Sequence, residues 1–165
     1  MRAIEEVKKM VVKKCEDLFE EFESSANDLR DLPNFQASDT YEIIHLALIK
    51  LTQLNQEAGF TYRKALRLQQ YVEESKLKAS AALKDAEMAT TTSSSFRPAS
   101  DIYLSRVEVE GKLRSRTFEE HYDMVTWATL AGEVATLVRI IQSYQADTTM
   151  RIKAIDARLR ILSMA

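Results

Sequence analysis

The sequence predicts an all-α fold: a long antiparallel coiled-coil helical hairpin with an N-terminal helical arm, assembled into an oligomeric bundle or ring. Three observations support this prediction. Only 3 glycines and 2 prolines occur in 165 residues, which leaves few places for turns and argues against a sheet. Two long stretches repeat uncharged residues every three or four positions. A Thr/Ser-rich segment at residues 89–100, closed by Pro98, separates them and predicts the loop of the hairpin.

The first stretch, residues 39–88, predicts one helix about 75 Å long. A helix of this length cannot cover its own apolar stripe, so it needs a partner helix from this chain or from another copy. Whether it continues through Gly59 is left open by the sequence. The stripe consists of Ile44, Ala47, Leu51, Leu54, Ala58, Thr61, Ala65, Leu68, Val72, Ser75, Ala79 and Ala82.

The second stretch follows the loop, and Ser100 or Asp101 can cap its helix or helices. Its early part is irregular, and Gly111 predicts a kink or a close helix contact there. From Trp127 the pattern is regular, with a stutter predicted between Thr148 and Ile152. This stripe consists of Trp127, Leu130, Val134, Leu137, Ile141, Tyr144, Thr148, Ile152, Ile155, Leu159 and Leu162.

The N-terminal arm is predicted as an amphipathic helix over residues 2 to about 25. Residues 26–38, which include Pro33, predict a linker, and Asp39 with Glu42 three residues later resembles a capping box for the long helix. The predicted division is therefore residues 1–38 and 39–165. Cys15, the only cysteine, lies on the apolar stripe of the arm, which fits a buried thiol and a reducing compartment.

A two-helix hairpin leaves apolar surface exposed, so self-association is expected, with a copy number that the sequence leaves open. The residues predicted to hold the oligomer are Leu51, Leu54, Leu68, Val72, Trp127, Val134, Leu137, Ile141, Ile152 and Ile155.

Basic residues gather locally even though the formal net charge is −2. Residues 1–40 carry an acidic excess, whereas the outer face of the long helix beyond Ala58 is basic, with Tyr62 and Tyr71 among the cations. Cations contact phosphates and aromatic rings stack on single-stranded bases, but a charged outer face can also be merely solvated. The candidate contacts are Arg63, Lys64, Arg67, Lys76, Lys78 and Lys84, with a secondary cluster at Lys112, Arg114 and Arg116.

Catalytic and metal-binding patterns are missing from the sequence. There is no Gly-rich phosphate loop, no nucleophile-and-base order and no His/Cys metal spacing, so we expect neither an enzyme nor a cofactor. Glu42 and His45 form half of a di-iron signature, but Phe118 stands where a second pair with His121 would need a glutamate. No run of 18 apolar residues occurs, so no membrane span is expected.

Two segments resemble T-even-type phage recombination mediators, the UvsY family, over about half the chain. Residues 151–156 read Arg-Ile-Lys-Ala-Ile-Asp, similar to the Ile-Lys-x-Ala-Ile-Asp-like turn that often closes that family's last helix, and residues 133–141 extend the likeness. The family's basic helix carries a Leu-Lys-Ala-Arg motif linked to binding of single-stranded DNA. Here residues 77–79 read Leu-Lys-Ala, and Ser80 stands in place of the arginine.

The resemblance implies a small helical oligomer that binds single-stranded DNA, with Lys78 as the best-matched contact. It also implies loading of a RecA-like recombinase, displacement of a single-strand binding protein, and a cytoplasmic location, the host cytoplasm if a phage encodes it. The sequence therefore predicts a non-enzymatic coiled-coil accessory of DNA recombination or repair. The alternative is a protein-binding helical adaptor, scaffold or inhibitor without nucleic-acid binding, whose partner the sequence does not identify.

Overall fold

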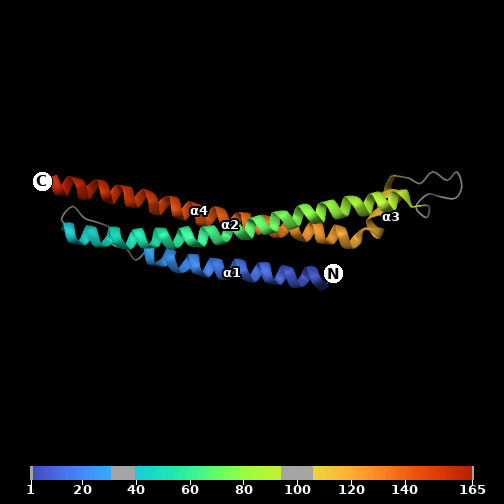
Figure 1. The fold of residues 1–165 in the computed structure, drawn as a ribbon, viewed down its shortest axis with the longest axis horizontal. Coiled ribbons are helices and arrows are strands. Elements are labelled where there is room, and N and C mark those ends of the chain that lie inside the picture. The colour runs from blue at the N-terminus through green and yellow to red at the C-terminus, as the bar shows by residue number, and fades with distance from the viewer. Residues whose placement is uncertain (1, 31–39, 94–105, 165) are drawn as a thin grey trace. The chain divides into compact units, whose positions relative to one another are not determined.

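The computed structural model describes residues 2–30, 40–93 and 106–164, which form four helices and no strand. They are α1 (Arg2–Arg30), α2 (Tyr41–Thr92), α3 (Arg106–Arg116) and α4 (Phe118–Met164) (Figure 1). The predicted all-α class is confirmed. The predicted caps Asp39, Ser100 and Asp101 lie outside the described residues, as do Pro33 and Pro98.

Helix α2 is continuous over 52 residues, and Gly59 does not interrupt it. A Cβ atom at Gly59 would meet Nε2 of Gln145 at 3.3 Å, so the glycine lies where α4 packs closely. The helix also runs past residue 88, which corrects the predicted start of the loop. The first threonines are part of the helix, and the Thr92 hydroxyl bonds to the carbonyl of Met88, four residues back, at 2.9 Å.

Helix α1 is longer than the sequence predicted, ending at Arg30 and not near residue 25. Leu29 explains the difference, because it is buried in an apolar cluster with side chains of α2 and α4. Tertiary packing therefore holds the last turn of α1 despite Asn27 and Asp28, which favour turns.

The break in the second half of the chain falls at Thr117, not at Gly111, which lies inside α3. The Thr117 amide and hydroxyl both bond to the carbonyl of Leu113, at 3.0 and 2.9 Å. The His121 amide then bonds to the Thr117 carbonyl at 2.9 Å. Helix α3 itself contains no buried residue.

Both predicted stripes are buried over most of their length. In α2 every stripe position from Ile44 to Val72 is buried, but Ala82 is exposed and its neighbour Leu83 is buried. The stripe therefore changes phase after Val72. In α4 the stripe is buried or half-buried from Trp127 to Leu159, and Leu162 is exposed.

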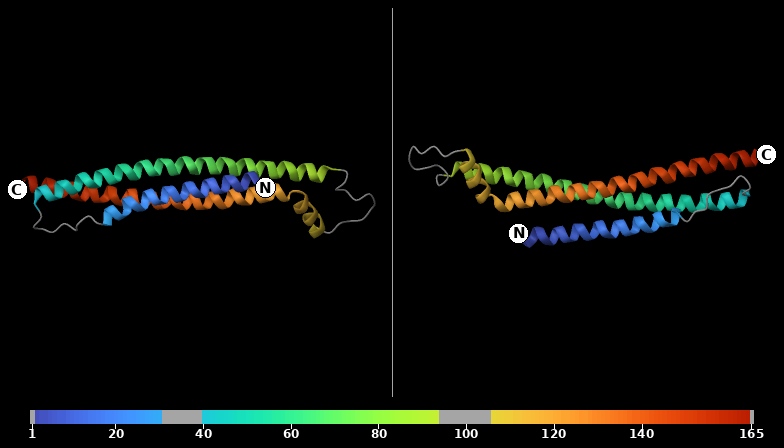
Figure 2. Two further views of the ribbon diagram at one scale, coloured as in Figure 1. Left: turned by 90° about the horizontal axis from the view of Figure 1, so that it is seen from below. Right: turned by 180° about the vertical axis from the view of Figure 1, so that it is seen from behind.

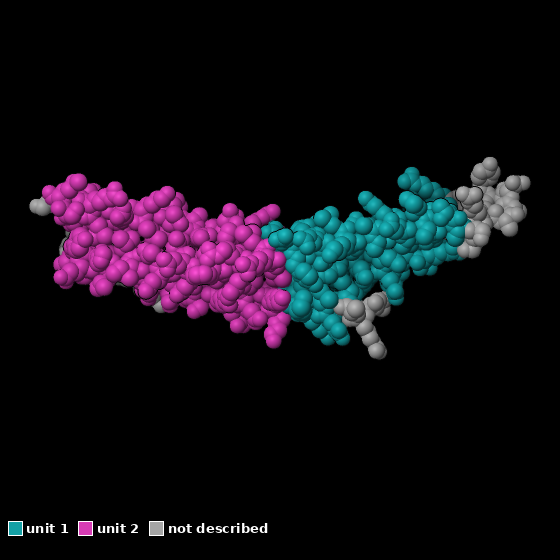
Figure 3. All heavy atoms as spheres, viewed as in Figure 1, with its two compact units in different colours: residues 1–12, 69–133 teal, residues 13–68, 134–165 magenta. Residues whose placement is uncertain are grey.

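The chain divides into two compact units, and each of the three long helices contributes to both (Figure 3). Unit 1 comprises residues 1–12 and 69–133, and unit 2 comprises residues 13–68 and 134–165. The units do not follow the predicted boundary at residue 38, because α1 is part of the packing of each.

Unit 1 holds an aromatic contact between α2 and α4 and a polar contact between α1 and α4. The rings of Tyr71 and Trp127 meet edge to face, with centroids 5.9 Å apart. The Tyr122 hydroxyl donates to the Glu5 carboxylate, and this hydrogen bond raises the pKa of Tyr122. One carboxylate oxygen of Asp123 is buried and accepts no hydrogen bond from the described residues.

In unit 2, α2 packs antiparallel to α4 and α1, as the views in Figure 2 also show. The Thr148 hydroxyl donates to Asn55 Oδ1 at 2.8 Å, and Gln145 lies against Gly59, so residue numbers rise on one helix as they fall on the other. The Tyr144 hydroxyl donates to the Ser25 carbonyl at 2.7 Å and ties α4 to α1. Burial raises the pKa of Tyr144 to about 12.

Candidate functional site

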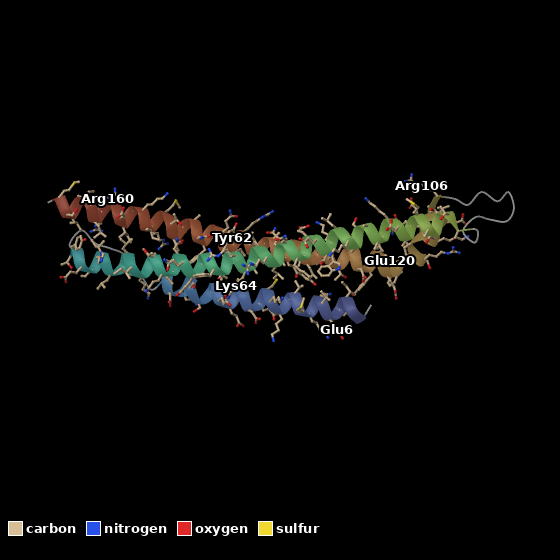
Figure 4. All side chains as sticks on the ribbon, viewed as in Figure 1. Glu6, Tyr62, Lys64, Arg106, Glu120 and Arg160 are labelled. Atoms are coloured by element: carbon tan, nitrogen blue, oxygen red, sulfur yellow. The ribbon has the colours of Figure 1, made fainter. Side chains whose placement is uncertain are left out.

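One side of α2 in unit 2 is covered by neither α1 nor α4. Helix α1 lies along the side that carries Lys64, whose Nζ is 2.8 Å from both carboxylate oxygens of Glu21 (Figure 4). Helix α4 lies along the side that carries Gly59. The remaining side presents Phe60, Arg63 and Arg67, which recur at spacings of three and four and are all exposed.

The antiparallel register brings residues of α4 level with this surface, and their side follows from two contacts. Gln145 meets Gly59 of α2, whereas Tyr144 faces α1. Gln142, one turn before Gln145, therefore borders α2 on the side away from α1. Because Gly59 lies at Gln145, the next turns of α2 run beside residues 138–142 of α4. Arg139 and Gln142 are exposed there, three residues apart, and Leu66 is exposed on the facing side of α2. We call this surface the basic face and define it as Phe60, Arg63, Leu66, Arg67, Arg139 and Gln142.

The basic face contains no carboxylate of its own. Residues 58–68 of α2 and 134–146 of α4 include no aspartate or glutamate. No aspartate or glutamate lies within one helical turn of Arg63, Arg67 or Arg139 on its own helix, so none of the three arginines is neutralised by a carboxylate of its own helix.

Phe60 is the exposed aromatic ring of this surface, with 61% of its side chain accessible. The Arg63 guanidinium lies over the ring, 4.6 Å from its centroid, in a cation–π contact. The tyrosines that the sequence proposed for stacking are placed differently. Tyr62 is half-buried toward α4 (Figure 4). Tyr71 packs on Trp127.

Lys64, one of the predicted contacts, is already bound within the chain. Lys64 forms an ion pair with Glu21 of α1. The Glu21 carboxylate also lies 3.5 Å from the Thr61 hydroxyl, so α1 contacts both Lys64 and Thr61. Lys64 borders the basic face but does not present its charge there.

The other predicted cations of α2 belong to unit 1 and do not form one patch. Lys76 pairs with Glu73 at 3.1 Å and is half-buried. Lys78 and Lys84 are exposed, but spacings of two and six residues point the three side chains to different sides of a helix.

The secondary cluster lies on α3, also in unit 1. Lys112, Arg114 and Arg116 are all exposed. Lys112 and Arg116 are one turn apart, whereas Arg114 points to another side. Nη1 of Arg116 lies 3.4 Å from the Ser93 hydroxyl, so this side chain is partly engaged at the end of α2.

Four members of the basic face were not identified from the sequence: Phe60, Leu66, Arg139 and Gln142. The acid-free runs at residues 58–72 and 134–146 were the available signal. Neither run indicates a binding surface by itself. The two runs indicate one only because the fold places these distant segments side by side.

The residues predicted to hold an oligomer are used inside the single chain. Ile152 is half-buried, and the other nine are buried. They cannot also form an interface without unfolding the packing around them, so any self-association must use other side chains. The nine are Leu51, Leu54, Leu68, Val72, Trp127, Val134, Leu137, Ile141 and Ile155.

Among the described residues, no group of three or more His, Cys, Asp or Glu side chains could hold a metal ion. His45 is exposed and stacks on Tyr41, with ring centroids 5.8 Å apart. Helix α4 is long and apolar enough to cross a membrane by length and composition alone, and 44% of its most apolar window is buried inside the chain. Core helices of water-soluble bundles pass the same test, so the absence of a membrane span stays a prediction.

No protein-family model, curated protein or solved structure matches the chain. Function is therefore inferred from the charges, contacts and exposed side chains described above.

Proposed function

We propose that the chain binds single-stranded nucleic acid through the basic face, without catalysing a reaction. The observation that supports this proposal is the grouping of three exposed arginines with an exposed phenylalanine on a surface free of carboxylates. Arginine forks bind phosphate oxygens, and an exposed ring offers a stacking surface to any base. A double helix hides its bases, so this combination favours a single strand.

The expected binding is modest for one chain. Three phosphate contacts correspond to a slope of about −2 in a plot of log affinity against log salt. Stacking of one base on Phe60 adds roughly 1–3 kcal/mol. Several copies bound to one strand would strengthen binding through effective concentration, without any new contact.

The role we propose for this binding is that of an accessory to DNA recombination or repair. A protein that holds single strands weakly at many points can keep them open for a RecA-like recombinase and compete with a single-strand binding protein. This finer proposal depends on the resemblance of residues 77–79 and 151–156 to the phage mediators and on the basic face.

Titration of a fluorescent poly-dT oligonucleotide at two salt concentrations tests the proposal. We expect binding at low salt that weakens steeply as salt rises, and weaker binding to a duplex of equal length. No binding at low salt would overturn the proposal and leave the protein-binding adaptor, for which helix α3, which contains no buried residue, is a candidate contact surface.

Releasing Lys64 from α1 should strengthen this binding. Glu21→Gln removes the carboxylate that holds the ammonium group, so Lys64 becomes available beside Arg67. One additional cation contact predicts an affinity for the oligonucleotide about two- to threefold higher. Glu20→Gln is the matched control, because Glu20 is an exposed residue of the same helix and the change in net charge is the same. Equal effects of the two variants would show that Glu21 acts only through overall charge.

A further inference from the structure

Exposed apolar side chains concentrate at one end of unit 2. Leu46 is 66% exposed and Ile161 is 69% exposed. The surrounding segments are almost uncharged: residues 41–49 include only Glu42, and residues 161–164 include no charge. We call this surface the apolar end, and its members are Ile43, Leu46, Ile49, Ile161, Leu162 and Met164.

The apolar end lies beyond the last turn of α1 (Figure 1). Leu29, one residue before the end of α1, belongs to the same buried cluster as Ile44 and Leu159. The first turns of α2 and the last turns of α4 extend beyond that point (Figure 1). Ile43 lies three heptads before Lys64, on the side of α2 along which α1 packs. Leu46 and Ile49 lie two heptads before Phe60 and Arg63, on the side of α2 that neither α1 nor α4 covers.

The exposed area is large enough for a specific contact. Its six apolar side chains are between 39% and 87% exposed, and functional apolar patches on monomers measure roughly 300–600 Å². Large exposed apolar patches on soluble chains usually mark interaction surfaces.

The order of residues in α2 indicates that the partner is a second copy of this chain. Ile43 and Ile49 each lie three residues from Leu46, and Glu42 and Lys50 each lie four residues from it. All five are exposed and share one face of the helix. Neither Glu42 nor Lys50 forms an ion pair with the described residues. A two-fold axis at Leu46 would therefore match this face with itself.

We propose that two chains pair through the apolar end, with α2 antiparallel to α2 of the second copy and Leu46 at the two-fold axis. Ile43 then packs on Ile49 of the second copy, and Glu42 meets Lys50 of the second copy twice by symmetry. The ends of the two α4 helices, with Ile161 and Leu162, flank the pair, and four helices complete a bundle where one chain has two.

Sedimentation velocity across a range of protein concentrations, without nucleic acid, tests the proposal. We expect a dimer in the wild type and a monomer for Leu46→Glu. The matched control is Leu77→Glu, because Leu77 lies on the same helix and is 69% exposed, but belongs to unit 1. A wild type that is monomeric throughout, or a Leu77→Glu variant that dissociates equally, would overturn the proposal.

A charge swap tests the register itself. Glu42→Lys or Lys50→Glu alone replaces two attractive pairs with two repulsive ones, and we expect each to weaken dimerisation about tenfold. The double variant Glu42→Lys/Lys50→Glu restores both pairs and should recover the affinity of the wild type. A double variant weaker than either single one would contradict the antiparallel pairing, whatever the state of association. Circular dichroism confirms that each variant keeps its helices.

Discussion

Charge reversal of Arg63 and Arg67 to glutamate should lower the affinity for a single-stranded oligonucleotide about a hundredfold at low salt. Each reversal removes a phosphate contact and places a carboxylate on a surface that has none, at a cost of roughly 1–1.5 kcal/mol per position. The dependence of affinity on salt should flatten as well, by about one unit of slope per lost contact. Fluorescence anisotropy with labelled poly-dT measures both quantities. Arg139→Glu should act in the same direction and would show that α4 contributes.

The control is the pair Lys78→Glu and Lys84→Glu, which changes the net charge by the same amount on the same helix. Both lysines are exposed, but they belong to unit 1 and point to different sides of α2. We expect a loss of affinity well below that of the arginine pair. A larger loss in the control would move the binding site to residues 76–84, which include the Leu-Lys-Ala sequence at 77–79 that resembles the motif of the phage mediators.

The stripe from Ile44 to Val72 could be predicted because helical periodicity is a local property. Every position there follows from spacing alone, and every one is buried. Beyond Val72 the same extrapolation chose Ala82, whereas the structure buries Leu83. Alanine is compatible with the buried or the exposed side of a helix, so Ala82 could not show which side faces the core. The larger Leu83 determines that side because its side chain packs there.

Helix ends were harder to predict because contacts distant in sequence determine them. Asn27 and Asp28 favour a turn locally, yet Leu29 carries α1 onward because it packs against α2 and α4. The second half of the chain breaks at Thr117, although its amide and hydroxyl both bond to the Leu113 carbonyl four residues back, as they would inside a continuous helix. A threonine in a helical sequence carries no clear signal of this kind.

The basic residues show the limit of reasoning from one helix at a time. Arg63 and Arg67 were identified correctly as exposed neighbours, because a spacing of four is sufficient for that inference. Lys64 is engaged by Glu21 of another helix, and Arg139 reaches the surface from a third. Neither relation can be read from the sequence of α2. The scatter of Lys76 and Lys78, by contrast, followed from helical geometry and could have been predicted.

Self-association was predicted because each apolar stripe needs a partner helix. The single chain itself supplies partner helices for most of both stripes. Three helices bury what two would leave exposed, so the residues named for an oligomer became core. Among the apolar side chains that stay exposed are Ile43, Leu46 and Ile161 of the apolar end. Ile43 and Leu46 fall outside the stripe, on the side of α2 that a single-partner hairpin would leave in solvent.

Leu51→Ala should destabilise the fold by about 2–5 kcal/mol, a large share of the stability of a small domain. Leu51 is 2% exposed and belongs to the cluster that joins all three long helices in unit 2, with Leu29 from α1 and Ile155 from α4. Truncation there leaves a cavity that rigid helices on three sides cannot easily fill. Urea denaturation followed by circular dichroism measures the loss, and Leu66→Ala, on the exposed side of α2, is the control expected to cost well under 1 kcal/mol. Equal losses would mean that α1 does not pack over Leu51 in solution, and the assignment of this stripe to the interior of the single chain would then be wrong.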